Sequence, residues 1–591
     1  MSIRVRLSWS VGAAALLVAG ADSPAQFPAV LRAQDLNGRN GFALYGTQRE
    51  DIVGHETAAA GDVNHDGYAD LLVGMRVALD PEPPNWWCPP GTVYVLFGRP
   101  GLGRSGVLYT SSDDTGAGFF IEGEVPCDYF SSGLAGLGDF NGDGVDDIAI
   151  GAMQADVPAA WRTLAGVVYV IFGHEGIGEG ARFDLGSLNG SNGFVIWGAA
   201  SYDRTGWSVA SASDFNDDGR PDLVIGAPGA DPYGMSGAGR AYVIYGGPGV
   251  SATGVIDLAT LDASQGLLIN GTTAGNWTGL DVAHANDVNG DGVDDIIMSG
   301  EHASPGGRYR AGQAYVVFGG VSKGRAVLDL WDLDGTNGFA INGVLAEDET
   351  GWQVGGASDL NADSFADVLL ASYAIPDAYV VFGGSGVGAS GLVELSDLNG
   401  KNGFIATVEL ASQTVAGGFD LNADARDDVV IGVPLSPYGI GDWGRCYVLF
   451  GGRFTGAPFI NLQTLDGRDG FLFEGPEPDD ATAGWPVAAA GDVNGDGLTD
   501  LAIGAGTATP PQTGQWRAGA VYVVFGRRVG DLDLDADVDL ADFLIFQQCF
   551  GGSDNPAGVG CPTDVVSDLD YDGDVDLADF LIFQQNFTGS R

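Results

Sequence analysis

An acidic nine-residue pattern occurs seven times along the 591-residue chain. Each copy reads Asp-x-Asn-x-Asp over its first five positions and has a further Asp at position nine. Carboxylate and amide oxygens at alternate positions of a tight loop are the ligands that a hard cation such as Ca²⁺ prefers. Three carboxylates in one loop also repel each other unless a cation neutralises them. The pattern therefore predicts seven calcium-binding loops.

The predicted side-chain ligands occupy positions one, three, five and nine of each copy. They are Asp62, Asn64, Asp66 and Asp70; Asp139, Asn141, Asp143 and Asp147; Asp214, Asn216, Asp218 and Asp222; Asp287, Asn289, Asp291 and Asp295; Asp359, Asn361, Asp363 and Asp367; Asp420, Asn422, Asp424 and Asp428; and Asp492, Asn494, Asp496 and Asp500. Position seven is expected to add a backbone carbonyl, from Tyr68, Val145, Arg220, Val293, Phe365, Arg426 and Leu498. The alternative is that Asp and Asn merely form hydrogen-bonded turns.

The acidic copies are parts of a longer repeat, since their starts lie 77, 75, 73, 72, 61 and 72 residues apart. Each copy is followed by an apolar run such as Leu71–Gly74 and by an aromatic-aliphatic run such as Tyr94–Gly98. Most are preceded by a turn and a short run such as Gly41–Tyr45. Runs of this composition, bounded by glycine, are typical of strands. About four strands in each unit predict an all-β fold, a seven-bladed β-propeller over residues 27–527.

The first unit and the last unit differ in a way that bears on ring closure. A run of the Gly41–Tyr45 type precedes the first acidic copy, and no equivalent follows the last aromatic run, Tyr522–Gly526. If each such run completes the preceding blade, Gly41–Tyr45 completes the seventh blade and removes an open sheet edge. The alternative is that each run belongs to its own unit, and the sequence leaves both arrangements open.

The units resemble FG-GAP repeats, the modules of the integrin α-subunit head. Residues 206–231 carry most of that pattern, including Gly226-Ala227-Pro228, and the resemblance covers roughly residues 35–526. The fourth, fifth and sixth units depart from it, with Ser299, Ser364 and Ala425 where glycine is usual. The resemblance implies a propeller that holds structural calcium and binds a partner through its loops.

A second repeat lies at residues 528–591, where residues 537–548 and 574–585 are identical. An acidic ladder in each copy fits positions 1, 3, 5, 9 and 12 of an EF-hand-like loop. The predicted ligands are Asp531, Asp533, Asp535, Asp539 and Asp542, and Asp568, Asp570, Asp572, Asp576 and Asp579. An apolar helix is expected after each loop, so the segment predicts a small helical domain with two more calcium ions.

The two loop-helix units resemble a dockerin, the module that anchors bacterial extracellular proteins to cohesin partners. In the dockerin family, positions ten and eleven help to choose the partner; here they are Leu540-Ala541 and Leu577-Ala578. These residues are apolar, so the partner can differ from a familiar cohesin. The alternative is that the pair caps the propeller, because exposed apolar residues serve either purpose.

The first 25 residues predict a secretory signal peptide, with Arg4 and Arg6 before a short apolar run, Val11–Ala19. The chain is therefore expected outside the cell, secreted or at its surface, with no membrane span after the signal is removed. Five cysteines leave at least one unpaired. Cys549 is expected to pair with Cys561 and, more loosely, Cys88 with Cys127, while Cys446 is expected to be buried.

The formal charge of −52 excludes nucleic acid and anionic membranes as partners. The sequence carries no G-x-S-x-G elbow, P-loop or Cys/His zinc pattern. We therefore predict a non-enzymatic adhesion, binding or scaffold protein whose loops bind an extracellular protein or glycan. Loops 75–92, with Trp86 and Trp87, and 152–166, with Trp161, are the candidate contacts, although plain packing of these tryptophans is an equal alternative. The other hypothesis is a polysaccharide lyase or hydrolase on a propeller scaffold.

Overall fold

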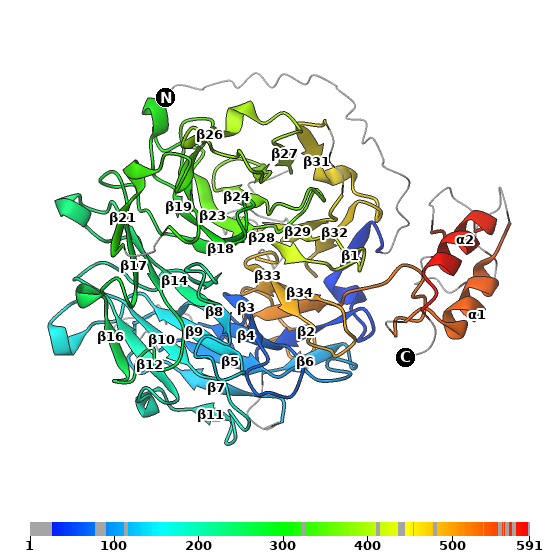
Figure 1. The fold of residues 1–591 in the computed structure, drawn as a ribbon. Helices are drawn as coiled ribbons and strands as arrows, with labels where there is room; N and C mark the ends of the chain where they lie inside the picture. Colours follow the sequence, from blue (N-terminus) through cyan, green and yellow to red (C-terminus); the bar gives the residue numbers. More distant parts are fainter. Residues whose placement is uncertain are drawn as a thin grey trace, which may run out of the picture.

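Seven sheets of five strands each form a ring in the computed structural model (Figure 1). The structure describes residues 27–76, 90–110, 116–321, 325–408, 414–434, 444–452, 454, 456–476, 482–535, 537–552, 558, 561, 567–569 and 575–588. The predicted signal peptide, Trp86, Trp87 and Cys88 lie outside these residues. None of the helices in the described part is long and apolar enough to cross a membrane.

Each sheet is one blade, and its five strands lie side by side in order from the axis of the ring to its outer edge. The first blade has β3 (Thr57–Gly61), β4 (Asp70–Met75), β5 (Thr92–Leu96), β7 (Gly118–Glu122) and β11 (Arg182–Phe183); the second β8 (Phe130–Gly138), β9 (Asp147–Ala152), β10 (Val167–Ile171), β12 (Gly193–Trp197) and β16 (Val255–Asp257); the third β13 (Val209–Ser213), β14 (Asp222–Ala227), β15 (Arg240–Ile244), β17 (Gly266–Asn270) and β21 (Val327–Asp329).

The remaining blades repeat this order. The fourth has β18 (Val282–Asn286), β19 (Asp295–Gly300), β20 (Gln313–Val317), β22 (Gly338–Asn342) and β26 (Leu392–Glu394); the fifth β23 (Thr350–Gly356), β24 (Val368–Ser372), β25 (Asp377–Val381), β27 (Gly403–Thr407) and β31 (Phe459–Asn461); the sixth β28 (Thr414–Phe419), β29 (Asp428–Val433), β30 (Arg445–Leu449), β32 (Gly470–Glu474) and β1 (Val30–Arg32); the seventh β33 (Val487–Gly491), β34 (Asp500–Ala505), β35 (Ala520–Val524), β2 (Gly41–Tyr45) and β6 (Val107–Tyr109).

Short 3₁₀ turns connect strands in the loops. They are Ala33–Asp35, Pro158–Ala160, Leu185–Ser187, Pro232–Gly234, Leu258–Thr260, Pro305–Gly307, Leu330–Asp332, Leu395–Asp397 and Leu462–Thr464.

The composition of each strand follows from its distance to the axis. The innermost strands of neighbouring blades pack against each other, so they use small residues, as in Ala58–Ala60. A Cβ on Gly136 would lie 2.6 Å from the carbonyl oxygen of Ala59 in the next blade. The second and third strands are covered on both faces, so they are continuously apolar, as in Val167–Ile171. The hydrophobic clusters lie between blades, and one of them joins Leu71 of the first blade to Val521 of the seventh.

The fourth strand of each blade comes from the following repeat, which decides between the two arrangements that the sequence leaves open. In the seventh blade, β2 pairs antiparallel with β35, and Phe42 lies opposite Val523. In the sixth blade, β1 pairs parallel with β32, and Leu31 lies opposite Phe473. The N-terminal segment thus completes two blades and closes the ring by hydrogen bonds rather than by a covalent link.

The fifth, parallel strand of each blade was not predicted. It has two or three residues and, counting around the ring, comes from the segment before the second acidic loop after that of its own blade. In the second blade, for example, the fifth strand is β16, which precedes the fourth acidic loop and pairs with β12. A run of two or three residues such as Arg182–Phe183 is too short to give a periodic pattern, which explains why the sequence did not reveal it.

The C-terminal segment forms the two predicted helices, α1 (Leu540–Cys549) and α2 (Leu577–Gln585). Figure 1 shows them beside the ring, next to β1 and β2, and not over its axis. Phe546 and Phe583 pack between the helices, and a disulfide joins Cys549 to Cys561, as predicted. Cys446 is buried and unbonded, as predicted. Cys127 is disulfide-bonded, while its predicted partner Cys88 lies outside the described residues.

Replacing Phe42 by Ala should destabilise the whole ring by about 3–5 kcal/mol, because it empties a buried site in the closing strand. Phe42 is 0% exposed, as is Phe194 at the same place in β12 of the second blade. Urea denaturation measures both variants, and Phe194→Ala is the matched control with a similar expected cost. A cost below about 1 kcal/mol for Phe42→Ala alone would show that β2 does not close the ring in solution.

Candidate functional site

The seven acidic loops occupy one face of the ring. Each loop connects the innermost strand of its blade to the second strand, as Asp62–Asp70 connects β3 to β4. Position six has a positive φ in all seven loops, including Ser364 (74°) and Ala425 (66°), where glycine is missing. The fifth and sixth loops therefore keep the turn of the others despite their departure from the pattern.

The aspartate at position nine is fully buried in every blade. In the second blade, Asp147 accepts hydrogen bonds from the backbone N–H groups of Asn141 and Gly173, both at 2.9 Å. Asn141 belongs to the same loop, and Gly173 ends the aromatic run of the third strand. The same two bonds recur in the other blades, from Val63 and Gly98, Asn216 and Gly246, Val288 and Gly319, Leu360 and Gly383, Leu421 and Gly451, and Val493 and Gly526.

These glycines have no room for a side chain. A Cβ on Gly173 would lie 2.1 Å from the carbonyl oxygen of Asp146, and the equivalent distances in the other blades reach at most 2.5 Å. The glycine therefore lets the third strand approach closely enough to donate to the buried carboxylate. The Phe-Gly end of the aromatic run and the last Asp of the acidic loop form one unit, although about 25 residues separate them in most repeats.

Burial disfavours the charged form of these carboxyls. It raises the pKa of Asp70, Asp147, Asp222, Asp295 and Asp367 to about 8, and the backbone hydrogen bonds offset the effect in part. The carboxylates at positions one and five of the same loop raise the pKa further. Burial likewise raises the pKa of Asp428 and Asp500 well above the ordinary value. A cation in the loop would favour the ionised form of all three acids.

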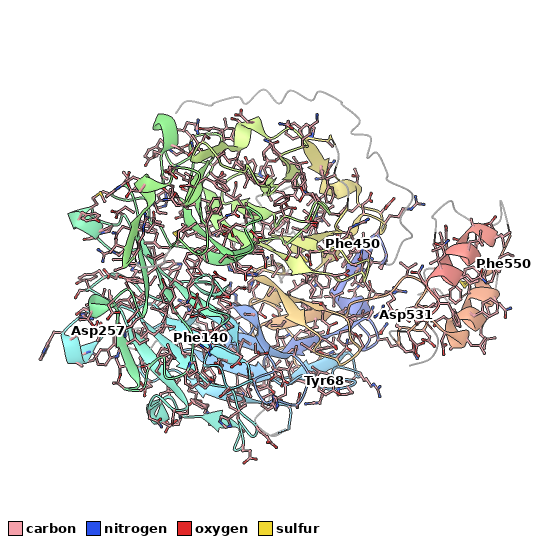
Figure 2. All side chains as sticks on the ribbon, in the orientation of Figure 1. Tyr68, Phe140, Asp257, Phe450, Asp531 and Phe550 are labelled. Atoms are coloured by element: carbon pink, nitrogen blue, oxygen red, sulfur yellow. A yellow bond between two sulfur atoms is a disulfide. The ribbon has the colours of Figure 1, made fainter. Side chains whose placement is uncertain are left out.

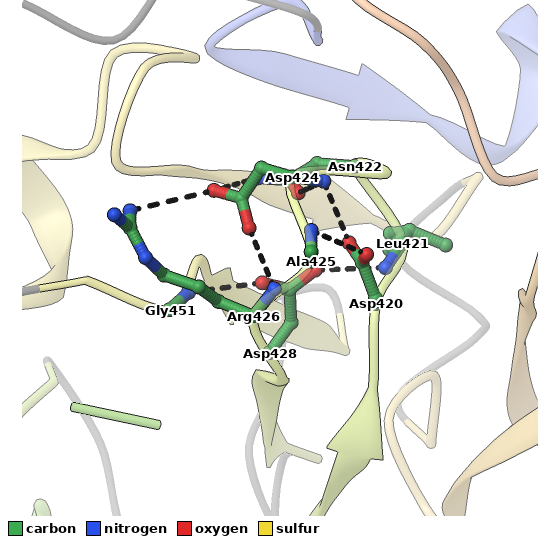
Figure 3. Close-up of polar contacts among 8 residues, drawn as sticks. All are labelled: Asp420, Leu421, Asn422, Asp424, Ala425, Arg426, Asp428 and Gly451. Atoms are coloured by element: carbon green, nitrogen blue, oxygen red, sulfur yellow. Dashed lines mark hydrogen bonds and ion pairs between the residues drawn. The ribbon is translucent and has the colours of Figure 1, made fainter. Parts of the chain in front are cut away.

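The sixth loop shows how the other acidic positions are held (Figure 3). Asp420 accepts from the N–H groups of Asp424 at 3.1 Å and Ala425 at 2.8 Å. Asp424 accepts from the N–H of Arg426 at 3.0 Å and from the amide of Asn422 at 3.4 Å. The residues at positions one and five thus form hydrogen-bonded turns, as expected if Asp and Asn serve only as turn formers. Their remaining lone pairs are available to a ligand.

Two predicted ligand atoms of the propeller loops are buried without a hydrogen-bond partner among the described residues. They are Oδ1 of Asp139, at position one of the second loop, and Oδ1 of Asn361, at position three of the fifth. A buried oxygen without a partner costs about 1–3 kcal/mol, and a bound cation would remove that cost. The oxygen-only donor set of these loops fits calcium. In the described part of the propeller, however, no three carboxylates lie within 4.8 Å of one another.

Such convergence occurs in the C-terminal domain. Asp531, Asp533 and Asp535 form one group within 4.8 Å, and Asp535, Asp537 and Asp542 form another. Burial and the neighbouring carboxylates of Asp542 and Asp535 raise the pKa of Asp533 to about 6. Asp537 was not predicted as a ligand because it stands at position seven, where an EF-hand-like loop uses a backbone carbonyl.

The last two predicted ligands of each C-terminal loop also begin the following helix. Asp539 accepts from the N–H of Ala541 at 2.6 Å, and Asp542 accepts from the N–H of Asp539 at 2.8 Å, which is a capping box. Asp542 is fully buried and also accepts from the N–H of Leu532. Asp576 and Asp579 repeat this arrangement in α2. Asp570 and Asp572 lie outside the described residues.

The opposite face of the ring carries the candidate partner loops. The second strand of each blade runs away from its acidic loop, so the loop after it, such as 153–166, emerges on this face. Trp161 is 92% exposed, so it does not pack against the propeller. At the axis, the residues that begin the innermost strands surround a cavity of about 610 Å³, which the sequence analysis did not predict.

Comparison with known protein families supports the repeats found in the sequence. An FG-GAP repeat model matches residues 56–74, 132–171, 205–244 and 484–524, which belong to the first, second, third and seventh repeats. The fourth to sixth repeats, whose departures are noted above, are not matched. The chain thus contains FG-GAP repeats in a seven-bladed all-β propeller.

Several relatives match part of the chain. A phosphatidylinositol-glycan-specific phospholipase D from Bos taurus is 36% identical over 192 residues, which are 32% of this chain and 20% of that protein. Integrin alpha-IIb from Homo sapiens is 32% identical over 191 residues, 32% of this chain and 16% of the integrin. Among solved structures, an exotype rhamnogalacturonan lyase covers 82% of this chain and 76% of its own, at 11% identity and a TM-score of 0.34. These two sequence matches span a fifth or less of each relative. The structural likeness is too weak to bear on function.

The metal-free protein should become less stable as the pH rises from about 5 to about 8. A carboxyl whose pKa is higher in the folded protein than in the unfolded chain binds more protons when folded, so raising the pH through this window favours unfolding. Thermal melting in EDTA at several pH values measures this. Asp147→Asn should reduce the pH dependence, whereas Asp262→Asn, at an exposed position, should not. A melting temperature that rises over this window would contradict the buried, protonated state.

Proposed function

We propose that this chain is a secreted, calcium-stabilised propeller that binds an extracellular protein or glycan and does not itself catalyse a reaction. The observation that carries the calcium proposal is the pair of buried, unpartnered oxygens on Asp139 and Asn361, each at a predicted ligand position. The same loop conformation recurs seven times, with three aspartates at the predicted ligand positions of each loop. Calcium at these loops would offset the like-charge repulsion and stabilise the connection between the first two strands of each blade.

The arrangement of the two faces supports a binding role. The acidic loops gather on one face, where their side chains are largely engaged in the turns. The opposite face has the loops that differ most between repeats, and Trp161 there is 92% exposed. Variable loops on a rigid scaffold are the usual place for recognition. The similarity to integrin alpha-IIb, at 32% identity over 191 residues, also supports a binding role.

The C-terminal domain would anchor the protein rather than cap the ring. Leu540 and Leu577, at position ten of the two loops, are each 62% exposed, and Leu544 and Leu581 one turn later are also exposed. A cap would bury these leucines against the propeller. One contact between this domain and the ring is polar, from the guanidinium of Arg39 to the carbonyl of Asp533 at 3.4 Å. We propose a dockerin-like role for this domain, with an apolar patch on the partner.

Calcium should raise the melting temperature, and chelation should lower it again. At 5 mM calcium and dissociation constants of about 0.1–1 mM, each site contributes about 1–2 kcal/mol. Isothermal titration calorimetry should count fewer sites in a variant with Asp139→Ala and Asp143→Ala. A variant with Asp184→Ala and Asp262→Ala is the control, because it removes two acids outside the predicted ligand positions. An unchanged melting temperature in wild-type protein would refute the calcium proposal.

Removing residues 528–591 should leave the calcium-dependent melting of the propeller unchanged if this domain is an anchor. The reason is that its helices stand beside the ring and its four leucines are more than half exposed. Differential scanning calorimetry of the shortened and full chains compares the two. A large fall in the melting temperature of the shortened chain would favour the capping role.

A further inference from the structure

The cavity at the axis is built from the same two positions of nearly every repeat. They are the seventh and sixth residues before the first aspartate of the acidic loop, as in Trp207 and Ser208 before Asp214. Because the blades are equivalent, these positions ring the axis on the face opposite the acidic loops. The residues that they contribute are His55 and Glu56, Ser132 and Gly133, Trp207 and Ser208, Leu280 and Asp281, Trp352 and Gln353, Thr414, and Trp485 and Pro486.

The residue types at these positions are not required by the fold. Serine and glycine fill them in the second blade, yet tryptophan stands there in the third, fifth and seventh blades. Glu56 of the first blade and Asp281 of the fourth occupy the equivalent position three blades apart, across the axis from each other. Acids and large aromatic residues that differ between otherwise equivalent blades indicate a ligand that contacts them unequally.

The tryptophan and tyrosine residues that line the cavity are partly exposed. Trp352 and Trp485 meet edge to face, with 6.3 Å between their ring centroids, and Tyr373 packs on Trp352 at 4.8 Å. On another side, the guanidinium of Arg76 lies 3.9 Å from the ring centroid of Tyr129. The cavity wall therefore offers flat apolar surfaces with polar groups between them, as small-molecule sites do.

The two acids, Glu56 and Asp281, differ in the hydrogen bonds that they can offer a ligand. Asp281 accepts hydrogen bonds from Oγ of Ser208 at 2.9 Å and from the N–H of Val354 at 2.8 Å. Burial raises the pKa of Asp281 to about 6 and, together with the charge of Asp281, raises the pKa of Glu56 to about 8. Near neutral pH, Glu56 can therefore donate a hydrogen bond and Asp281 can accept one.

We propose that this cavity binds a neutral sugar ring of an oligosaccharide, which stacks on the tryptophans and hydrogen-bonds to Glu56 and Asp281. A sugar has an apolar face and hydroxyl groups that both donate and accept. Acidic sugars and other anions are disfavoured by these carboxyls and by the −52 charge of the chain. An organic cation is disfavoured by the positive charge of Arg76, which also lines the cavity. The proposal rests on the binding role proposed above but not on calcium.

Tryptophan fluorescence and isothermal titration calorimetry test this on the full chain in calcium. The probes are cellobiose and xylobiose as polysaccharide fragments, and mannobiose and diacetylchitobiose as glycoprotein fragments. Digalacturonate and choline represent the acidic and cationic alternatives. We expect at least one neutral disaccharide to bind. Glu56→Ala and Trp352→Ala should each weaken it about tenfold or more, while Trp331→Ala, at an exposed position outside the cavity, should not.

The outcomes separate this proposal from the earlier one. Binding of digalacturonate or choline alone, binding of none of the probes, or unchanged affinity in both cavity variants would overturn the sugar site. The calcium-dependent melting temperature, measured on the same samples, shows whether each variant is folded. If calcium still stabilises the protein while no sugar binds, the sugar site fails and the calcium proposal stands.

Discussion

The fold depends on a buried carboxylate that accepts two backbone hydrogen bonds in each blade. The last aspartate of the acidic loop begins the second strand or directly precedes it. Its oxygens accept from an N–H group of its own loop and from the glycine two residues after the third strand. One side chain therefore fixes three segments of the blade. Removing an acceptor would leave two buried donors unpaired, which is more costly than the loss of an exposed hydrogen bond. This requirement explains why that aspartate and that glycine recur together in all seven repeats.

The same arrangement places several acids in a small volume, and this connects stability with charge. A fully buried carboxyl with two acids in its own loop is either protonated or neutralised by a cation. Calcium would allow every blade to keep its carboxylates ionised at the pH of an extracellular fluid. In this interpretation, the loops stabilise the scaffold, and their regular repetition reflects a structural requirement rather than a site for a substrate.

The proposed recognition surface is the opposite face, where the repeats are free to differ. The positions around the axial cavity are equivalent by symmetry but carry tryptophan, acid, serine or leucine in different blades. Closure of the ring by β1 and β2 makes that face rigid, because each blade is packed between two neighbours and no end blade has a free edge. The C-terminal helices stand beside this ring with their leucines exposed, so the propeller and the proposed anchor can act separately.

The sequence by itself determined the number of blades, about four strands of each repeat, the acidic loops and both C-terminal helices. These features are local and repeated seven times or twice, so a pattern of residue types is enough to define them. Tertiary structure decided what depends on contacts between distant segments. It joined Phe42 to the seventh blade and paired Asp147 with Gly173, and it gathered Glu56, Asp281 and three tryptophans around the axis. The members of each group lie in different repeats or at opposite ends of one repeat, so only the closed ring brings them together.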